Sequence, residues 1–201
     1  MPASTLRILV LSTLSCGALL ASHPAMAAPA DQPTPAQPAC SGLLQQNFLR
    51  LQDEKPQSLC QYSGKVVVVV NTASFCGFTP QYDGLQKVQD NYARKGFTVV
   101  GVPSGDFKGQ EYGSNGEIAG FCKAKGVKFP LAEKSDVVGP GTIPIYRWAA
   151  ARLGPDNAPK WNFHKYLIGR DGKLIAAFGS KTEPSDPKVT QAIEAALARR
   201  S

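Results

Sequence analysis

Short apolar runs, separated by polar segments that contain glycine and proline, divide the chain into alternating strands and helices. Val66 to Val70 are five consecutive β-branched residues, which is typical of a strand buried on both faces. After Pro80 the apolar positions follow the period of a helix, and proline is common near the first position of a helix. In chain order the pattern predicts a strand at 66–70, a helix at 80–95, a strand at 97–102, helices at 115–125 and 144–153, strands at 163–169 and 173–178, and a helix from about Pro187 to Arg199.

The order of these elements predicts the fold class. Asp171-Gly172 is the turn dipeptide expected of a hairpin between the last two strands, and Asp186 is a suitable cap for the last helix. A parallel β-α-β unit followed by an antiparallel hairpin and a helix is the thioredoxin-like arrangement. We therefore expect an α/β protein with a thioredoxin-like fold, in which helices flank a central mixed β-sheet.

The N-terminal segment has the pattern of a secretory signal peptide. Arg7 precedes an apolar stretch from Ile8 to Leu20, and Ala25-Met26-Ala27 supplies the small residues of a cleavage site. We expect residues 1–27 to be removed, with cleavage near Ala27. The mature protein would then be periplasmic or secreted.

Further expectations concern membrane attachment and domain organisation. Cys16 raises the alternative of a lipoprotein, but Thr13 and Leu14 stand in the wrong order for the usual lipid-attachment box. No other apolar run is long enough to span a bilayer. Residues 28–39 contain four prolines and indicate a flexible leader, so that residues 40–201 form one domain, large enough for a full core.

The distribution of charge argues against a nucleic-acid partner. The chain has 22 basic and 15 acidic residues, a net charge of +7, and Arg7 is the one charged residue of the signal peptide, so +6 is left after cleavage. The basic residues are scattered and are not interleaved with aromatic residues, unlike those of a nucleic-acid-binding surface. Weak attraction to anionic membrane surfaces stays open.

Four cysteines are kept in the mature chain, at positions 40, 60, 76 and 122. An even number in an exported protein suggests pairing and allows three connectivities. No two of them have the spacing of zinc ligands, and His164 is the only histidine of the mature chain, so we expect no metal site. Cys40 and Cys60 flank a short helical pattern, and we expect a structural disulfide between them that fixes this element. The pattern consists of Leu43, Leu44, Phe48 and Leu51.

Cys76 lies where a nucleophilic cysteine would be placed. It is in the loop between the strand at 66–70 and the helix that follows Pro80, next to a helix N-terminus. There, unpaired N–H groups and the positive end of the helix dipole favour an anion, and the thiolate is the reactive form of cysteine. The alternative interpretation of a lone cysteine is a small buried hydrophobic residue.

Three known cysteine motifs do not fit this loop. A dithiol redox motif needs a cysteine where this chain has Thr79, and the thiol-peroxidase pattern of peroxiredoxins needs a threonine where it has Ala73. A copper carrier needs a histidine, and a cysteine where this chain has Pro80.

The sequence around Cys76 resembles the active-site signature of the glutathione peroxidase family. The resemblance spans about residues 41 to 185 and is carried by Val70 to Ser74, Cys76-Gly77, Thr79, Gln81-Tyr82, Pro103-Ser104, Phe107, Gln110-Glu111, Gly113 to Asn115, Glu117-Ile118, Phe121-Cys122, Phe129-Pro130, Lys134, Trp161 to Phe163 and Lys165 to Leu167. It implies the thioredoxin-like fold and a thiol peroxidase that acts without a cofactor. The substrates implied are hydrogen peroxide and organic or lipid hydroperoxides.

The resemblance also implies roles for four residues. Cys76 would attack the peroxide, while Gln110, Trp161 and Asn162 match the family's glutamine, tryptophan and asparagine. Amide and indole N–H groups are never deprotonated near neutral pH, so they suit donation of hydrogen bonds to a leaving oxygen. Taken alone, each of the three has an ordinary interpretation as a solvated loop, core or turn residue.

The chain departs from the family pattern near Gln110. Relatives usually have Asn, then Phe-Gly two residues later, and Pro after Gln-Glu. This chain has Gly105, Lys108 and Tyr112 at the places of that Asn, Gly and Pro. We expect these changes to alter the turn that holds Gln110 and the access of substrates.

Cys122 lies on a helical pattern with Ile118 and Phe121, which alone favours a buried structural thiol. It matches the resolving cysteine of family members that form an internal disulfide, which implies that Cys122 condenses with the sulfenic acid of Cys76 after local rearrangement of its helix. The reductant would then be a dithiol protein of the thioredoxin kind rather than glutathione. Residues 148–160 lack the insertion that tetrameric relatives use for assembly, which implies a monomer.

Two other classes of function stay open. An exported thiol-disulfide oxidoreductase or redox sensor could pass a Cys76–Cys122 disulfide onward, although the chain lacks a vicinal dithiol. A non-catalytic binding module with a thioredoxin-like fold is the other alternative. For the peroxidase, export leaves the source of electrons open, because thioredoxin is cytoplasmic and the periplasm is oxidising.

Overall fold

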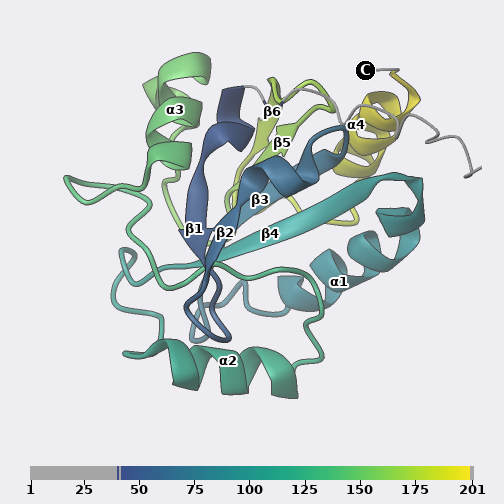
Figure 1. Cartoon of the computed structure of the whole chain (residues 1–201). Coiled ribbons are helices and arrows are strands. Elements are labelled where there is room, and N and C mark those ends of the chain that lie inside the picture. The colour runs from purple at the N-terminus through teal and green to yellow at the C-terminus, as the bar shows by residue number, and fades with distance from the viewer. Residues whose placement is uncertain (1–39, 41, 200–201) are drawn as a thin grey trace, which may run out of the picture. The chain divides into compact units, whose positions relative to one another are not determined.

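The computed structural model describes residues 40 and 42–199 (Figure 1). The predicted signal peptide, the flexible leader and the lipid-attachment alternative at Cys16 lie outside the described residues. Among the described residues, no helix has the length and apolar character needed to cross a membrane.

A mixed four-stranded sheet forms the centre of the domain. Its strands are β3 (Val66–Thr72), β4 (Phe97–Pro103), β5 (Lys165–Ile168) and β6 (Leu174–Phe178), in the order β4-β3-β5-β6. β3 pairs in parallel with β4 and antiparallel with β5, and β5 pairs antiparallel with β6. The predicted parallel unit and C-terminal hairpin are therefore both present, and the thioredoxin-like α/β fold is confirmed.

Four α-helices accompany the sheet in the described part of the chain (Figure 1): α1 (Gln81–Tyr92), α2 (Asn115–Ala124), α3 (Pro144–Leu153) and α4 (Pro187–Ala198). Each lies within a few residues of its predicted range. α1 is shorter than expected, because the chain tightens into a 3₁₀ turn over Ala93–Lys95 and then reverses at Gly96 in the left-handed conformation. The side chain of Asp186 caps α4 by accepting a hydrogen bond from the Lys188 N–H, as predicted.

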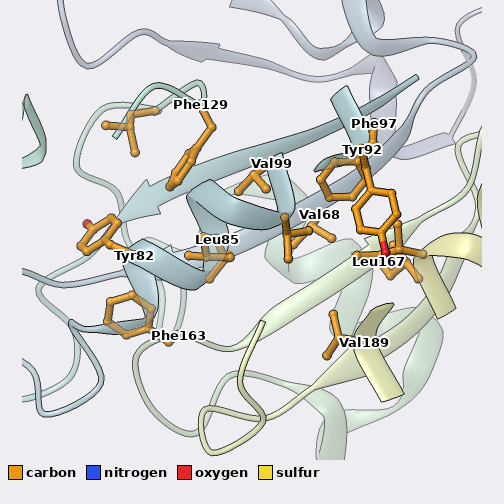
Figure 2. Close-up of a cluster of buried hydrophobic side chains, with 14 of the residues drawn as sticks. Val68, Tyr82, Leu85, Tyr92, Phe97, Val99, Phe129, Phe163, Leu167 and Val189 are labelled. Atoms are coloured by element: carbon orange, nitrogen blue, oxygen red, sulfur yellow. The ribbon is translucent and has the colours of Figure 1, made fainter. Parts of the chain in front are cut away.

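Two hydrophobic clusters lie on opposite faces of the sheet, because successive residues of a strand point to opposite sides. The first cluster packs mainly against α1 and α4, and it includes Val66, Val68, Val70, Tyr82, Leu85, Tyr92, Phe97, Ile118, Cys122, Phe129, Phe163, Leu167, Val189 and Ile193. The second cluster packs against α3, and it includes Leu44, Leu59, Val67, Val69, Val100, Ile145, Tyr146 and Tyr166. Figure 2 shows the first cluster, with Tyr82 close to Phe129 and Phe163 at one end and Tyr92 beside Phe97 at the other.

The helix predicted between Cys40 and Cys60 is wrong. The segment forms a 3₁₀ turn at Gly42–Gln45, an antiparallel pair of β1 (Asn47–Leu49) with β2 (Pro56–Ser58), and a second 3₁₀ turn at Leu59–Tyr62. Leu44 is buried in the second cluster and Leu51 in the first, so the two do not share one helix face. Tertiary burial on two faces of the sheet overrides the local apolar spacing.

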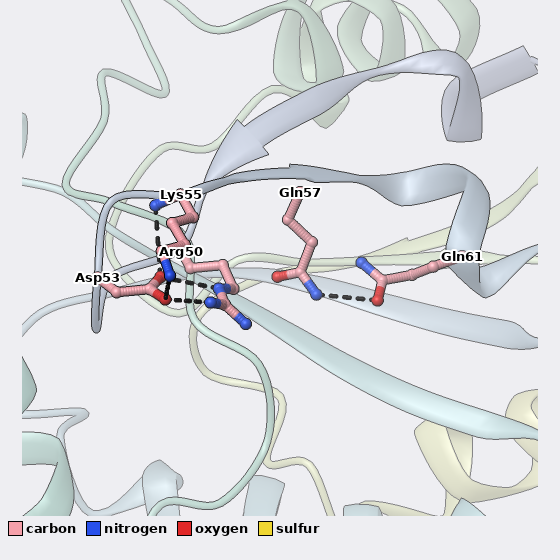
Figure 3. Close-up of polar contacts among 5 residues, drawn as sticks. All are labelled: Arg50, Asp53, Lys55, Gln57 and Gln61. Atoms are coloured by element: carbon pink, nitrogen blue, oxygen red, sulfur yellow. Dashed lines mark hydrogen bonds and ion pairs between the residues drawn. The ribbon is translucent and has the colours of Figure 1, made fainter.

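Exposed polar side chains form hydrogen bonds in the β1–β2 connection and between β2 and the 3₁₀ turn that follows it (Figure 3). Arg50 donates to both carboxylate oxygens of Asp53, and Gln57 donates to Gln61 at 2.9 Å. These groups are exposed, so each pair contributes little to stability.

A disulfide joins Cys40 to Cys60 in the structure, with 5.3 Å between their Cα atoms. Cys40 packs against the second cluster. Closing a loop of this length stabilises by about 3 kcal/mol in the chain-entropy model. The bond therefore ties the start of the domain to the turn that precedes β3.

Candidate active site

Cys76 lies in the loop between β3 and α1, and Thr79 fixes the conformation of this loop. The Thr79 hydroxyl accepts a hydrogen bond from the Cys76 N–H at 3.1 Å and donates one to the Ala73 carbonyl at 3.0 Å. The Thr79 N–H donates to the Cys76 carbonyl at 3.0 Å. Thr79 occupies the place of the second cysteine in a dithiol motif, and here its side chain shapes the loop instead.

The sulfur of Cys76 is a free thiol with one hydrogen-bond partner among the described residues. The Phe78 N–H donates to Sγ at 3.4 Å, and 7% of the residue is exposed. An N–H group directed at sulfur, just before a helix, is a suitable partner for a thiolate. The neighbouring Phe75 is 56% exposed, so the loop meets solvent directly beside the sulfur.

Gln110 is held against this loop by its backbone. Its carbonyl accepts a hydrogen bond from the Phe75 N–H at 3.0 Å. The two preceding residues, Lys108 and Gly109, are both in the left-handed conformation, with φ of 60° and 62°. Lys108 stands where relatives usually have glycine, and it adopts a conformation that is unfavourable for a residue with a side chain by about 1–2 kcal/mol. Despite this change, the turn brings Gln110 to the Cys76 loop.

Asn162 and Gln110 are in direct contact. Asn162 is fully buried, and its Nδ2 donates to Oε1 of Gln110 at 3.0 Å. The amide nitrogen of Gln110 donates to no other described residue, so it is available to a bound molecule. The hydrogen bond thus occupies the oxygen of the Gln110 amide rather than its nitrogen.

Asn71 positions the segment that carries Trp161 and Asn162. Its Nδ2 donates to the Trp161 carbonyl at 3.2 Å, and its Oδ1 accepts from the His164 N–H at 3.0 Å. Its carbonyl accepts from the N–H of Phe163, which has a positive φ of 62°. The sequence motif includes Asn71, but its positioning role depends on the antiparallel pairing of β3 with β5.

Two buried basic residues follow this segment. The ammonium group of Lys165 donates to the carbonyls of Phe163 and Thr182 at 2.7 and 2.8 Å, and burial lowers its pKa to about 8. Burial also lowers the pKa of His164 to about 4, with a further contribution from the charge of Lys165. Lys165 therefore helps to hold the strained Phe163 next to Asn162.

Trp161 is half-buried. Its ring lies against the Phe107 ring and near the ammonium group of Lys108. The centroids of Phe107 and Trp161 are 5.7 Å apart, and Lys108 Nζ is 5.8 Å from the Trp161 ring centroid. The indole N–H donates to none of the described residues. Like the Gln110 amide, it is available to a bound molecule.

The structure therefore connects the four predicted residues to different degrees. Gln110 and Asn162 touch, Trp161 directly precedes Asn162, and Gln110 reaches the Cys76 loop through Phe75. Within the described part of the chain, the sulfur of Cys76 makes no hydrogen bond to Gln110, Trp161 or Asn162. Their roles in catalysis stay predictions.

Cys122 is buried in the first cluster on α2. Its thiol is 3.7 Å from the hydroxyl of Tyr82, to which it donates, and 2% of the residue is exposed. Burial raises the pKa of Cys122 to about 11, an effect that the Tyr82 hydroxyl partly offsets and Glu111 increases. In this arrangement Cys122 is a protonated thiol at neutral pH and is not a nucleophile.

Glu111, the residue after Gln110, is a buried acid. Burial raises the pKa of its carboxyl, and Oε1 accepts a hydrogen bond from the Tyr112 N–H at 2.9 Å. The sequence resemblance includes Glu111 without giving it a role. Within the described residues, no group of three or more His, Cys, Asp or Glu side chains could hold a metal ion.

Comparison with known proteins identifies relatives over most of the domain. The sequence profile of the family described as "Glutathione peroxidase" matches residues 46–150. Hydroperoxy fatty acid reductase gpx1 of Synechocystis sp. is 43% identical over 143 residues, which cover 67% of this chain and 85% of the relative. Thioredoxin/glutathione peroxidase BtuE of Escherichia coli is 36% identical over 170 residues, which cover 73% of this chain and 93% of the relative.

Solved structures agree in fold. A structure described as Trgpx in apo form superposes with a TM-score of 0.65 at 33% identity, covering 81% of this chain and 99% of the other. A thiol:disulfide interchange protein of the thioredoxin family from Chlorobium tepidum superposes with a TM-score of 0.57 at 19% identity, covering 76% of this chain and 92% of the other. At that identity the second likeness shows the thioredoxin-like fold alone.

Proposed function

This chain belongs to the glutathione peroxidase family and is a thiol peroxidase, and we propose that it reduces hydroperoxides at Cys76 and resolves the oxidised cysteine with Cys122. The observation that carries the proposal is the position of Cys76. Its sulfur accepts the Phe78 N–H just before α1, and the carbonyl of Gln110 bonds to the adjacent Phe75. A nucleophile and free amide and indole donors thus belong to one connected set of loops.

In the first step the thiolate of Cys76 attacks the terminal oxygen of a hydroperoxide. A sulfur–oxygen bond forms and the oxygen–oxygen bond breaks, which gives a sulfenic acid on Cys76 and an alkoxide that takes a proton to leave as an alcohol, or as water from hydrogen peroxide. The Gln110 amide and the Trp161 indole would donate hydrogen bonds to the leaving oxygen, where its negative charge develops. Asn162 orients Gln110 through the 3.0 Å hydrogen bond.

In the second step the thiol of Cys122 attacks the sulfenic sulfur of Cys76. A disulfide forms, and the sulfenic oxygen leaves as water with one proton from the Cys122 thiol. Cys122 is buried and its pKa is raised to about 11. This step therefore needs α2 to open, which exposes Cys122 and restores the ordinary acidity of its thiol.

The reductant must return two electrons to the Cys76–Cys122 disulfide. A dithiol protein of the thioredoxin kind does so by thiol–disulfide exchange, and glutathione is the alternative. The E. coli relative is named for both thioredoxin and glutathione. We favour the dithiol protein, because an internal disulfide is the form that a dithiol reduces directly.

The Cys40–Cys60 disulfide has a separate, structural role. Cys40 packs against the second cluster, whereas Cys76 and Cys122 both belong to the first, on the other face of the sheet. Cys40 and Cys60 are already joined while Cys76 and Cys122 are free thiols. These observations support Cys76 and Cys122 as the reactive pair.

Organic and lipid hydroperoxides are proposed as substrates beside hydrogen peroxide. The relative from Synechocystis is named as a hydroperoxy fatty acid reductase. In this chain the ring of Phe75, the residue before Cys76, is 56% exposed. An apolar substrate chain could therefore be accommodated beside the sulfur. We further propose that the mature protein is an exported monomer, on the basis of the signal sequence and the short segment 148–160.

Steady-state turnover of hydrogen peroxide and a fatty-acid hydroperoxide tests the proposal, with a thioredoxin system and with glutathione in parallel. We expect turnover with the thioredoxin system, and its loss in Cys76→Ser, because a serine hydroxyl is not ionised at neutral pH. The matched control is the double variant Cys40→Ser/Cys60→Ser, which should keep its turnover number. Turnover by Cys76→Ser near the wild-type rate would contradict the proposal.

A further inference from the structure

Three aromatic rings connect the loop of Cys76 to the helix of Cys122. The ring centroids of Phe75 and Tyr112 are 4.4 Å apart in an edge-to-face arrangement, and those of Tyr112 and Phe121 are 5.8 Å apart. Phe75 directly precedes Cys76, and Phe121 directly precedes Cys122. We call Phe75, Tyr112 and Phe121 the aromatic bridge.

The middle residue of the bridge is fixed at its backbone. The Tyr112 carbonyl accepts a hydrogen bond from the ammonium group of Lys134 at 2.9 Å, and the Tyr112 N–H donates to Glu111 at 2.9 Å. Two residues later, Ser114 caps the N-terminus of α2 and forms a capping box with Glu117. The backbone of Tyr112 is thus held by hydrogen bonds, while its ring contacts Phe75 of the Cys76 loop and Phe121 of α2.

The helix at the other end of the bridge is intrinsically weak. α2 has ten residues and contains Gly116 and Gly120, and a Cβ atom at either position would meet nothing within 4 Å. Glycine lowers helix stability without a packing reason at these positions. A short helix of this composition depends on side-chain contacts to stay closed. Phe121 supplies such contacts to Tyr112 and also to Tyr82, at 6.3 Å between centroids.

Opening of this helix must disturb the bridge. Cys122 is buried against Tyr82 and is a free thiol, as is Cys76. In the proposed function, its part of α2 opens before Cys122 bonds to Cys76. Phe121, as the adjacent residue, moves with it and separates from Tyr112. Tyr112 also packs on Phe75, so the same ring contacts the residue that precedes Cys76.

We propose that Tyr112 is a positioning residue that holds the Cys76 loop and α2 in the closed arrangement, and so limits the rate at which Cys122 resolves oxidised Cys76. The inference rests on the proposed function, in which Cys122 is the resolving cysteine. Tyr112 stands where the family pattern usually has proline, whose ring is not aromatic and cannot form these ring contacts. Slow resolution would prolong the sulfenic acid on Cys76.

Rapid mixing of the reduced protein with one equivalent of hydrogen peroxide tests this role. The first phase, oxidation of Cys76, is followed by capture with a 1,3-dione that labels sulfenic acids, and the second by acid-quenched mass analysis of the disulfide. In Tyr112→Ala we expect the first rate to stay within about twofold of wild type. The second rate should rise about threefold to tenfold, as expected for the loss of one or two aromatic contacts.

Three further variants separate the bridge from a general loss of stability. Tyr112→Phe keeps the ring and should resolve at the wild-type rate. Phe75→Ala removes an exposed ring, leaves the core intact and should also speed resolution, so it tests the bridge even if Tyr112→Ala does not fold. Tyr92→Ala removes the edge contact with Phe97 at 6.0 Å, at the other end of the first cluster, and should leave resolution unchanged.

Two results would overturn the inference, and they differ in whether the proposed function fails with it. If wild type forms a Cys76–Cys122 disulfide but Tyr112→Ala and Phe75→Ala resolve at the wild-type rate or more slowly, the bridge is not a restraint on resolution and the proposed function stands. If wild type consumes the peroxide and forms no such disulfide, the resolving role of Cys122 and the role of Tyr112 fail together.

Discussion

The side-chain amide of Asn162 donates to that of Gln110 at 3.0 Å, and this contact joins two loops that lie 52 residues apart in the sequence. An amide that accepts through its oxygen has its nitrogen turned away from the partner. The contact therefore orients the Gln110 N–H groups, and these stay available beside the loop of Cys76. It links the buried Asn162 to Gln110 beside the Cys76 loop.

We predict that Asn162→Ala and Gln110→Ala each slow oxidation of Cys76, because each removes a donor or its orientation. Loss of a comparable oxyanion donor lowers a rate by about a hundredfold to a thousandfold. The effect of Gln110→Ala should be at least as large as that of Asn162→Ala, because Asn162 acts through its contact with Gln110. Stopped-flow experiments at several peroxide concentrations measure the rate of Cys76 oxidation in each variant.

The double variant Asn162→Ala/Gln110→Ala should be little slower than the slower single variant, since the two residues act as one unit. An oxidation rate unchanged in both single variants would show that neither residue acts on the leaving oxygen.

Removal of the Cys40–Cys60 disulfide should weaken the fold without affecting chemistry. For Cys40→Ser/Cys60→Ser we predict a free energy of unfolding lower by about 3 kcal/mol, from the loop that the bond closes. Urea unfolding followed by circular dichroism checks this value. Peptide mapping of the exported wild type without reduction should recover the Cys40–Cys60 linkage. Two free thiols at these positions would contradict it.

His164 should make stability depend on pH between about 4 and 6.5. Its pKa is lowered from 6.5 to about 4 in the folded state, so the unfolded chain binds a proton first as the pH falls. The free energy of unfolding is therefore unaffected by this group above pH 6.5. It decreases by about 3 kcal/mol in total as the pH falls toward 4.

The measurement for His164 is urea unfolding at several pH values for wild type and His164→Gln. In the variant, the free energy of unfolding should lack the decrease that His164 causes between pH 6.5 and pH 4. Glu111 contributes in the opposite direction, because its pKa is raised, and it is retained in both proteins. Equal slopes for the two proteins would show that His164 is not a neutral buried group.

The pH dependence of the resolving step distinguishes an open from a closed helix. Burial raises the pKa of Cys122 to about 11 in the closed arrangement. If α2 opens first, the exposed thiol has ordinary acidity and the rate of disulfide formation should level off near pH 8.5. A rate that keeps rising toward pH 11 would mean that Cys122 reacts from its buried position. Quenched-flow analysis of the disulfide from pH 6 to pH 10 gives the profile.

Much of the fold could be predicted because local pattern and burial agree. The continuous β-branched run of Val66 to Val70 is buried on both faces, and Asp186 caps α4 as its position suggests. The segment between Cys40 and Cys60 was predicted wrongly, since Leu44 and Leu51 have helical spacing but are buried in different clusters. Which face of a sheet takes a side chain is a tertiary property, and apolar spacing alone does not contain it.

The site shows the same division. The loop of Cys76 was predicted from a strand, a cysteine and a helix start that are adjacent in sequence. The positioning by Asn71 was not, because its partners Trp161 and His164 reach it through the pairing of β3 with β5. The turn before Gln110 is expected to differ from that of relatives, and this stays a prediction; in this chain Lys108 is in the left-handed conformation.

The most direct test of the account is to identify the cysteine that receives the peroxide oxygen. Reduced Cys122→Ser, with its Cys40–Cys60 bond intact, is treated with one equivalent of hydrogen peroxide and a 1,3-dione, and the labelled peptide is mapped by mass spectrometry. We expect a single label on Cys76, in an amount close to the peroxide consumed. Peroxide consumption with no label on Cys76, or with the Cys40–Cys60 bond altered instead, would contradict it.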